Sequence, residues 1–535
     1  MPADRCLLRL GASGLIEVIS PFDAVTQAQL RRLRPRGQWC GRRQCWQFPL
    51  EAAQVLQASL GHRFAVEPDL QAWFDWLAQP LPPLPPHRAL VAAAALDQDL
   101  ADGRSLMLHQ RSGARWLLAR RGAVLADAMG LGKTMTALAA ARALVRLADC
   151  RVVVVAPVGL HAHWLREAAA VQLHLELHSW AALPSALPPA GCVLIADEAH
   201  YAQNSQTQRT AALLRLARHP RLRACWLLTG TPMKNGRPAQ LHPLLAAIGH
   251  PIAADQRAFE ARYCAGYWSE QGGRRQWNAQ GASNLDELQR LVRPLMLHRR
   301  KQDCLDLPPK HRLLQPVQLS DPDASAFDRE LQVCLQDYRR RAALGLVRRD
   351  AEALAALSAL RQLGSKYKLQ AACDLVEPLL ARGESVVVFT AFVASARALV
   401  HRLAPGAAAG PLTGAVEATK RQQLVDAFQR GETPLLVTTY GTGGLGFTLH
   451  RARHVVLLER PWTPGDAEQA EDRCHRIGMG AALQCHWLQL GAADQLVDGL
   501  IASKADRIAV VLGAQRRELR RQRLAAMVDE LLAAA

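Results

Sequence analysis

Features that would place this chain in a membrane or outside the cell are missing from its sequence. Its 535 residues contain no run of eighteen apolar residues without a charge, so we expect no membrane span. Residues 1–14 lack the basic segment and long apolar stretch of a secretory signal. The twelve cysteines are dispersed without a CxxC pair, and no histidines follow Cys40 and Cys45 at zinc-finger spacing. We therefore expect reduced thiols and a cytoplasmic protein, associated with the nucleoid if the source is bacterial.

Acidic residues are also in short supply. The chain has 65 Lys and Arg against 47 Asp and Glu, a formal net charge of +18. A basic surface attracts polyanions, and nucleic acid is the commonest polyanion in a cell. An arginine-rich proteome would produce the same surplus without any function, so the charge alone leaves both interpretations open.

Prolines divide the N-terminal part of the chain from the rest. Residues 77–88 (LAQPLPPLPPHR) contain five prolines, which resist both helix and sheet and favour an extended linker. We expect a small α+β domain over residues 1–79 and a proline-rich linker over residues 80–105.

Short apolar runs typical of buried parallel strands recur from residue 106 onward. They lie at 124–126, 152–156, 193–196, 226–228, 386–389, 435–437 and 455–458. Strands that are apolar on both faces predict parallel sheets covered by helices, with ligands at the carboxyl ends of the strands. We therefore predict an α/β fold.

The strands fall into two groups, which predicts two lobes. These are residues 106–252 and 370–513, separated by a helical connector over 253–369 and followed by a basic helix at 514–535. Within the connector, residues 264–283 are glycine-rich with two tryptophans and paired arginines, and we expect a loop there.

A phosphate-binding loop is predicted at residues 127–134 (DAMGLGKT), between a strand and a helix-forming stretch. Glycines allow backbone N–H groups to face phosphates, and the following helix adds its positive end. Lys133 would neutralise the β- and γ-phosphates of ATP, and Thr134 would bind Mg²⁺. The predicted ATP contacts in the loop are Asp127, Ala128, Met129, Gly130, Leu131, Gly132, Lys133 and Thr134.

Two adjacent carboxylates end the strand in VLIADEAH (193–200). Neighbouring residues of a strand point opposite ways, so the two side chains have different tasks. We assign Asp197 to Mg²⁺ through its hydration shell, and Glu198 to the attacking water. A strand that runs into an acid-capped helix is the alternative.

Further elements would pass the state of the nucleotide to a bound substrate. They lie in TGTP (229–232), TTYGTGGLGFTL (438–449) and QAEDRCHRIG (469–478), and the residues concerned are Thr229, Gly230, Thr231, Thr439, Gly443, Gly444 and Gln469. Arg473 and Arg476 lie three residues apart, on one side of a helix, and would stabilise the phosphate in the transition state. Alternatively, these arginines form ion pairs with Glu471 and Asp472.

In this order, these segments resemble motifs I, II, III, V and VI of the Swi/Snf-type helicase-like ATPases of helicase superfamily two. The opening stretch LMLHQRSGARWLL (106–118) is similar to a further motif of that family, which implies that Gln110 lies near the adenine. Two departures are Ala128, where the family has an acidic residue, and Met479, where it has a polar one. The resemblance implies two RecA-like lobes and ATP-driven translocation on duplex DNA.

The annealing-helicase branch of that family is suggested by two segments. Residues 283–312 are similar to the branch's connecting segment, and residues 20–60 are similar to its HARP substrate-recognition domain. Trp46 and Phe48 would then form the aromatic pair of that domain, or else simply fill its core.

The function expected from this resemblance is remodelling or reannealing of forked DNA, in repair or replication restart, by a monomer. A nucleotide-gated DNA-binding adaptor and an RNA helicase of the same superfamily are the alternatives. We expect binding to double-stranded or forked DNA to be directed chiefly at phosphate, and therefore insensitive to sequence and weakened by salt.

Overall fold

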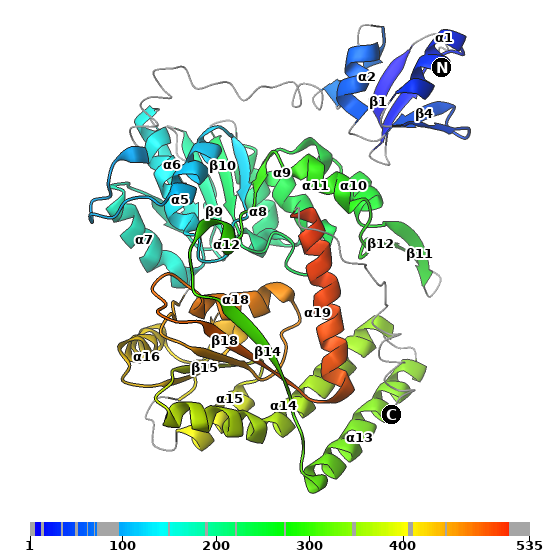
Figure 1. Ribbon diagram of the computed structural model, residues 1–535. Coiled ribbons are helices and arrows are strands. Elements are labelled where there is room, and N and C mark those ends of the chain that lie inside the picture. The colour runs from blue at the N-terminus through cyan, green and yellow to red at the C-terminus, as the bar shows by residue number, and fades with distance from the viewer. Residues whose placement is uncertain are drawn as a thin grey trace. The chain divides into compact units, whose positions relative to one another are not determined.

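The computed structural model describes residues 6–512 with thirteen short gaps (Figure 1). The gaps are residues 12–14, 34–35, 49–51, 61–62, 69, 72–95, 148–149, 188–190, 220–221, 272–273, 345–348, 405–409 and 444–446. Most of the predicted linker, Gly444 and the predicted basic helix at 514–535 therefore lie outside the described residues. No described helix is both long enough and apolar enough to cross a membrane.

A small α+β domain forms the N-terminal part, as predicted. Its elements are β1 (Leu7–Leu10), β2 (Ile16–Ile19), α1 (Ala24–Arg32), β3 (Gln38–Cys40), β4 (Cys45–Phe48), α2 (Ala53–Leu60) and β5 (Ala65–Val66). The sheet order is β3-β4-β2-β1-β5. Asp23 caps α1 by accepting hydrogen bonds from the amides of Val25 and Thr26.

The aromatic residues singled out in this domain fill its core. Trp46 is 8% exposed and Phe48 is fully buried, and the Trp46 indole donates a hydrogen bond of 2.7 Å to Gln27. Of the two alternatives for Trp46 and Phe48, the structure therefore contains the second, in which both rings fill the core. Trp39 on β3 is the exposed ring, at 48%, and it packs edge-on against Trp46.

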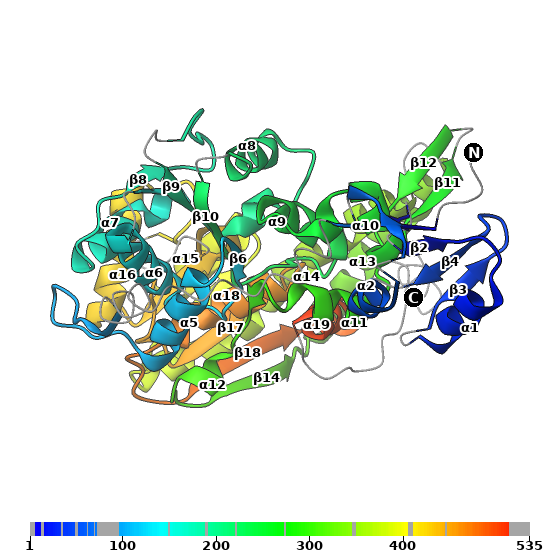
Figure 2. The same ribbon diagram turned by 90° about the horizontal axis from the view of Figure 1, so that it is seen from above.

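The first large sheet is parallel and carries helices on both faces (Figure 2). Its elements are α5 (Leu108–Leu118), β6 (Gly122–Leu125), α6 (Lys133–Leu147), β7 (Arg151–Val155), α7 (His161–Ala170), β8 (Glu176–His178), β9 (Cys192–Asp197), α8 (Gln208–Ala217), β10 (Leu222–Leu228), α9 (Leu241–Ala247) and α10 (Gln256–Tyr263). The strand order is β13-β6-β10-β9-β7-β8. Every residue of β9 is buried, which explains its uninterrupted apolar sequence.

The connector contains strands as well as the helices expected there. Its elements after α10 are β11 (Tyr267–Gln271), β12 (Arg274–Asn278), α11 (Leu285–Val292), β13 (Met296–Leu297), α12 (Lys301–Cys304), β14 (Lys310–Pro316), α13 (Asp321–Leu344) and α14 (Arg349–Ala381). The expected loop at 264–283 is in fact an antiparallel hairpin of β11 and β12. β13 extends the first sheet beside β6, and β14 belongs to the second sheet. Two compact units meet in sequence at Arg299 and Arg300, and the described residues 507–512 belong to the first.

The second large sheet is also parallel, in the order β14-β18-β17-β15-β16. Its remaining elements are β15 (Val386–Thr390), α15 (Val393–Leu403), α16 (Ala418–Arg430), β16 (Leu435–Thr439), α17 (Tyr440–Gly443), β17 (His454–Leu457), α18 (Pro464–Cys474), β18 (Leu483–Gln489) and α19 (Gly491–Val511). The apolar face of α14 packs on this sheet through Ala372, Cys373 and Val376. The two parallel-sheet lobes predicted from the sequence are confirmed.

Candidate active site

The predicted phosphate loop lies between the end of β6 and the start of α6. Gly130 and Gly132 have positive φ angles of 86° and 74°, which residues with a side chain rarely adopt. A Cβ atom at Gly132 would also collide with the Gln110 side chain. The Lys133 ammonium donates hydrogen bonds to the carbonyl oxygens of Asp127 (2.8 Å) and Ala128 (3.4 Å). The loop backbone therefore curves around the Lys133 ammonium, and the Gln110 side chain of α5 packs beside Gly132.

Asp127, which was predicted to contact ATP, is paired inside the protein. Its carboxylate is fully buried and accepts two hydrogen bonds from Arg299, at 3.0 Å and 2.5 Å. Arg299 also donates to the carbonyl of His109 in α5, at 2.5 Å. Arg299 therefore ties the end of the first lobe's sheet to the phosphate loop. Sequence reasoning missed this residue, because 172 positions separate it from Asp127.

The two carboxylates at the end of β9 have different surroundings, as their adjacency predicts. Asp197 is 6% exposed and accepts hydrogen bonds from the Trp164 indole (2.8 Å) and the Glu198 amide (2.9 Å). Glu198 has a left-handed φ of 49°, and its carboxylate lies 3.1 Å from His200 Nδ1. A non-glycine residue in that conformation stores strain, which is common at functional sites.

Burial raises the pKa of the Asp197 carboxyl to about 6, and the negative charge of Glu198 adds to the effect. Lys133 opposes the shift. A buried carboxylate beside a second negative charge is stabilised in its ionised form by an additional cation. The Trp180 indole donates a hydrogen bond of 2.8 Å to the backbone carbonyl of Asp197. Neither Trp180 nor Trp164, which bonds the Asp197 carboxylate, was identified from the sequence, because an isolated tryptophan forms no recognisable motif.

The residues present fit a magnesium ion held with a triphosphate. In the described part of the chain no three His, Cys, Asp or Glu side chains group as a self-sufficient metal site. Mg²⁺ at nucleotide sites takes only one or two protein oxygens, because phosphates and water supply the rest. Thr134, the second residue of α6, would supply one of those oxygens, and Asp197 would hold the ion through its hydration shell.

The TGTP segment lies beside the phosphate loop. A Cβ atom at Gly230 would stand 2.8 Å from Met129 Cγ and 3.5 Å from Lys133 Nζ. The buried Gln203 side chain donates hydrogen bonds of 2.8 Å to the carbonyls of both Thr231 and Pro232. Gln203 thus joins the segment after Glu198 to TGTP, a link that the sequence did not indicate.

In the second unit, Arg473 lies in the last turn of α18 and Arg476 lies two residues beyond the end of that helix, so the two do not share one helix face as predicted. Both arginines nevertheless contact one segment. Arg473 donates to the carbonyl of Phe447 at 3.4 Å, and Arg476 donates to the Thr448 hydroxyl at 2.9 Å. The motif that contains Thr448 therefore positions both arginines. Thr439 and Thr442 exchange a hydrogen bond of 3.0 Å at the end of β16, Gly443 ends α17, and Gln469 is half-buried on α18.

The acids next to these arginines pair with other cations. Glu471 is fully buried, with Arg312 at 2.7 Å and Lys310 at 3.0 Å. Asp472 lies 2.9 Å from Lys301 and 3.3 Å from Lys310. The alternative in which Glu471 and Asp472 pair with the two arginines is not what the structure contains, because α12 and β14 supply the partners.

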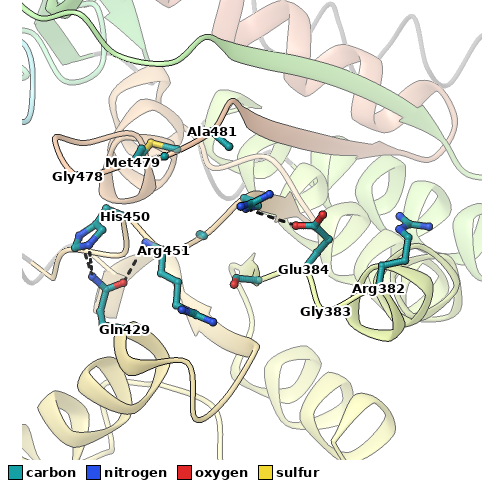
Figure 3. Close-up of a pocket in the computed structure, with 13 residues that line it drawn as sticks. Arg382, Gly383, Glu384, Gln429, His450, Arg451, Gly478, Met479 and Ala481 are labelled. Atoms are coloured by element: carbon teal, nitrogen blue, oxygen red, sulfur yellow. Dashed lines mark hydrogen bonds and ion pairs between the residues drawn. The ribbon is translucent and has the colours of Figure 1, made fainter.

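A polar hollow of about 460 Å³ lies at the amino ends of β15, β17 and β18 (Figure 3). Met479 lines it, together with a hydrogen-bonded pair of Gln429 and His450. Arg453 faces Glu384 at 3.7 Å. The Arg382 and Arg451 side chains point in different directions and do not converge on one position (Figure 3). The hollow therefore lacks the arrangement of an anion site.

Comparison with protein families identifies two domains. The SNF2-related domain matches residues 109–179 and 190–369, and the helicase conserved C-terminal domain matches residues 367–478. Together these matches contain every residue assigned above to nucleotide chemistry.

Similar curated proteins include three with longer chains. The bovine (Bos taurus) DNA annealing helicase and endonuclease ZRANB3 is 30% identical over 338 residues, covering 61% of this chain and 30% of that protein. The putative ATP-dependent helicase/translocase YwqA of Bacillus subtilis is 26% identical over 459 residues (75% and 48%). The SWI/SNF-related matrix-associated actin-dependent regulator of chromatin subfamily A-like protein 1 of Xenopus tropicalis is 27% identical over 502 residues (86% and 51%). The chain thus spans about half or less of each.

Among solved structures, the SWI2/SNF2 ATPase core of Sulfolobus solfataricus in complex with dsDNA is similar to this chain. The identity is 20%, the alignment covers 77% of this chain and 94% of that one, and the TM-score is 0.34.

Proposed function

This chain belongs to the Swi/Snf-type ATPases of helicase superfamily two, and we propose that it hydrolyses ATP to move along double-stranded DNA. The observation that carries the proposal is the grouping of Lys133, Asp197 and Glu198 at the carboxyl edge of one sheet. A phosphate loop, a buried carboxylate that needs a cation and a strained second carboxylate are together the parts of a phosphoryl-transfer site.

In the proposed reaction, the loop amides and Lys133 bind the phosphates of ATP. Asp197 and Thr134 would hold Mg²⁺, which neutralises phosphate charge when bound. Glu198 orients the attacking water and accepts its proton. Arg473 and Arg476 stabilise the negative charge that develops on the transferred phosphate.

Gln203 offers a route by which the nucleotide site could act on DNA. Its side chain donates hydrogen bonds to the TGTP carbonyls, and it follows Glu198 closely in the sequence. A shift of one segment is therefore transmitted to the other. We propose that double-stranded or forked DNA is the partner, and that the protein acts as a monomer to remodel or reanneal forks. The similarity to an annealing helicase supports this finer assignment.

Phosphate release tests the activity. We expect turnover that rises strongly with duplex or forked DNA, and less with single-stranded DNA or RNA of equal length. Lys133→Ala and Glu198→Gln should each abolish turnover, and Glu198→Gln should still bind ATP because its phosphate contacts remain. Turnover that persists in either variant would place the site elsewhere, and DNA binding without any hydrolysis would favour the adaptor.

The second-unit arginines have a separate test with a matched control. Arg476→Ala should lower the hydrolysis rate by about 10³- to 10⁵-fold, the usual contribution of a transition-state arginine, with ATP binding retained. Arg430→Ala is the control, since Arg430 is 60% exposed and pairs with Glu432, two residues away. Equal rates in the two variants would remove Arg476 from the mechanism.

A further inference from the structure

The hairpin of β11 and β12 exposes aromatic rings that the nucleotide site does not use. Tyr267 is 51% exposed and Trp268 is 52% exposed. The hairpin extends away from the first sheet, beyond α10 (Figures 1 and 2). Tyr267 and Trp268 are neighbours on β11 and therefore point to opposite faces of the hairpin. A single exposed ring is common on protein surfaces, so Trp268 indicates a binding surface only together with the charged groups around it.

Arginines flank the exposed indole. The Arg257 guanidinium lies 5.0 Å from the Trp268 ring and 4.9 Å from the Trp277 ring, and Arg275 lies 5.7 Å from Trp268. Two acids adjoin this face: Glu270 lies directly across from Arg275 in the strand register, and Glu260 accepts a hydrogen bond from Trp277. Trp268, Trp277, Arg257 and Arg275 form a face that combines an exposed ring with two guanidinium groups, which we call the hairpin face.

The base of the hairpin is held firmly in the fold. The Trp277 indole donates a hydrogen bond of 2.6 Å to Glu260, which is 9% exposed on α10. A Cβ atom at Gly266 would collide with the Trp277 ring. The Ser283 hydroxyl accepts from the Ala265 amide at 2.9 Å and donates to the Arg262 carbonyl at 2.7 Å. Trp277 therefore anchors the hairpin, and Trp268 stays exposed on a fixed support.

We propose that the hairpin face binds unpaired DNA bases at a junction, with Trp268 stacked on a base and Arg257 and Arg275 on the adjoining phosphates. Bases inside a duplex are covered by their neighbours, so ring stacking selects single-stranded segments. Phosphate contact alone would need only the arginines. That the nucleic acid is DNA rests on the proposed function. The new element is that this hairpin recognises the unpaired strand.

Binding without nucleotide tests this face independently of hydrolysis. Fluorescence anisotropy of the full chain would compare a labelled single-stranded oligonucleotide, a fork with unpaired arms and a blunt duplex. Trp268→Ala should weaken binding to the single strand and the fork by about 5- to 50-fold, the usual loss of one stacked base, and leave the duplex unchanged. Trp268→Phe should restore most of the affinity, and Arg275→Ala should weaken it about 2- to 5-fold.

Two further variants make the result decisive. Trp268→Leu keeps apolar volume but has no ring face, so it should behave as Trp268→Ala and replaces that variant if it fails to fold. Arg382→Ala removes an exposed arginine of the second unit and should change none of the affinities.

Each outcome bears on one claim. Equal binding by Trp268→Ala and wild type, or an equal loss for duplex and single strand, would overturn the hairpin assignment. The assignment would also be overturned if the wild type preferred RNA to DNA and Trp268→Ala removed that preference. It would be overturned as well if the wild type were a dimer that Trp268→Ala converts to a monomer, because a second copy of the chain would then occupy the face. Absent DNA-stimulated hydrolysis in wild type would instead contradict the proposed function and leave the binding result intact.

Discussion

Two buried carboxylates, one at the end of β9 in the first unit and one on α18 in the second, differ in what faces them. Asp197 is 6% exposed in the first unit, and burial and the charge of Glu198 raise its pKa to about 6. Asp472 is 9% exposed in the second unit. Burial acts on it in the same direction, but Lys310 and Lys301 outweigh burial and lower its pKa. Asp197 can therefore be neutralised by a cation that binds reversibly, whereas Asp472 is neutralised by two lysines of the protein itself.

The difference in charged neighbours indicates that Asp197 serves the nucleotide site and that Asp472 stabilises the fold. A buried charge without a fixed partner destabilises the fold and persists where a ligand needs it. A buried charge with two lysines serves to join α12, β14 and α18 into one unit. Arg473 and Arg476, in the same motif as Asp472, are thereby left to contact the segment around Thr448.

The largest expected effect is at Asp197. Asp197→Asn should reduce hydrolysis by at least about 10³-fold, because the cation loses its charged protein ligand. The same change should leave thermal stability unchanged or raise it, because it removes a buried negative charge. Phosphate release and a melting curve measure the two. Lost activity together with a large fall in stability would break the comparison.

Asp472→Asn should show the reverse pattern. It leaves Lys301 and Lys310 buried without one of their acids, a change that typically costs about 3–5 kcal/mol. Hydrogen exchange of β14 and α18 amides measures this local loss in a chain of several parts. Glu432→Ala is the control, because Glu432 is 56% exposed in its pair with Arg430, and an exposed ion pair contributes little to stability. Comparable exchange in both variants would show that the lysines do not depend on Asp472.

The smallest expected effect is a loss of stability in acid at one histidine of the first unit. His250 in the first unit is 2% exposed, and burial lowers its pKa to about 4, although its hydrogen bond to Leu291 opposes the shift. A lowered histidine pKa means that the folded state excludes a proton which the unfolded chain binds. Stability is therefore complete above pH 6.5 and falls as the pH drops from 6.5 towards 4, by up to roughly 3 kcal/mol.

Hydrogen exchange of α9 and α11 at pH 7 and pH 5 would measure the fall due to His250. His250→Gln should reduce the pH dependence of that exchange, because glutamine does not titrate. A pH dependence identical to that of wild type would assign the effect to another group.

The sequence predicted the places of the candidate site residues best where the pattern is local. The loop at 127–134, the carboxylates 197 and 198 and the arginines 473 and 476 all lie at strand or helix ends, because glycine, charge and strand patterns are local. It left alternatives open where one residue type has two uses. Trp46 and Phe48 suit a recognition pair and a core equally well, and only packing distinguishes them.

By itself the sequence determined two parallel sheets, their order along the chain and the chemistry at their edges, since apolar strands and glycine loops need no distant partner to be recognised. The tertiary structure alone decided that Arg299 holds Asp127, that Lys301 and Lys310 neutralise Asp472, and that residues 267–278 form a hairpin. Ion pairs and cross-strand contacts between distant residues leave no periodic signal, because many pairings of the same charges satisfy one sequence and only the folded backbone selects among them.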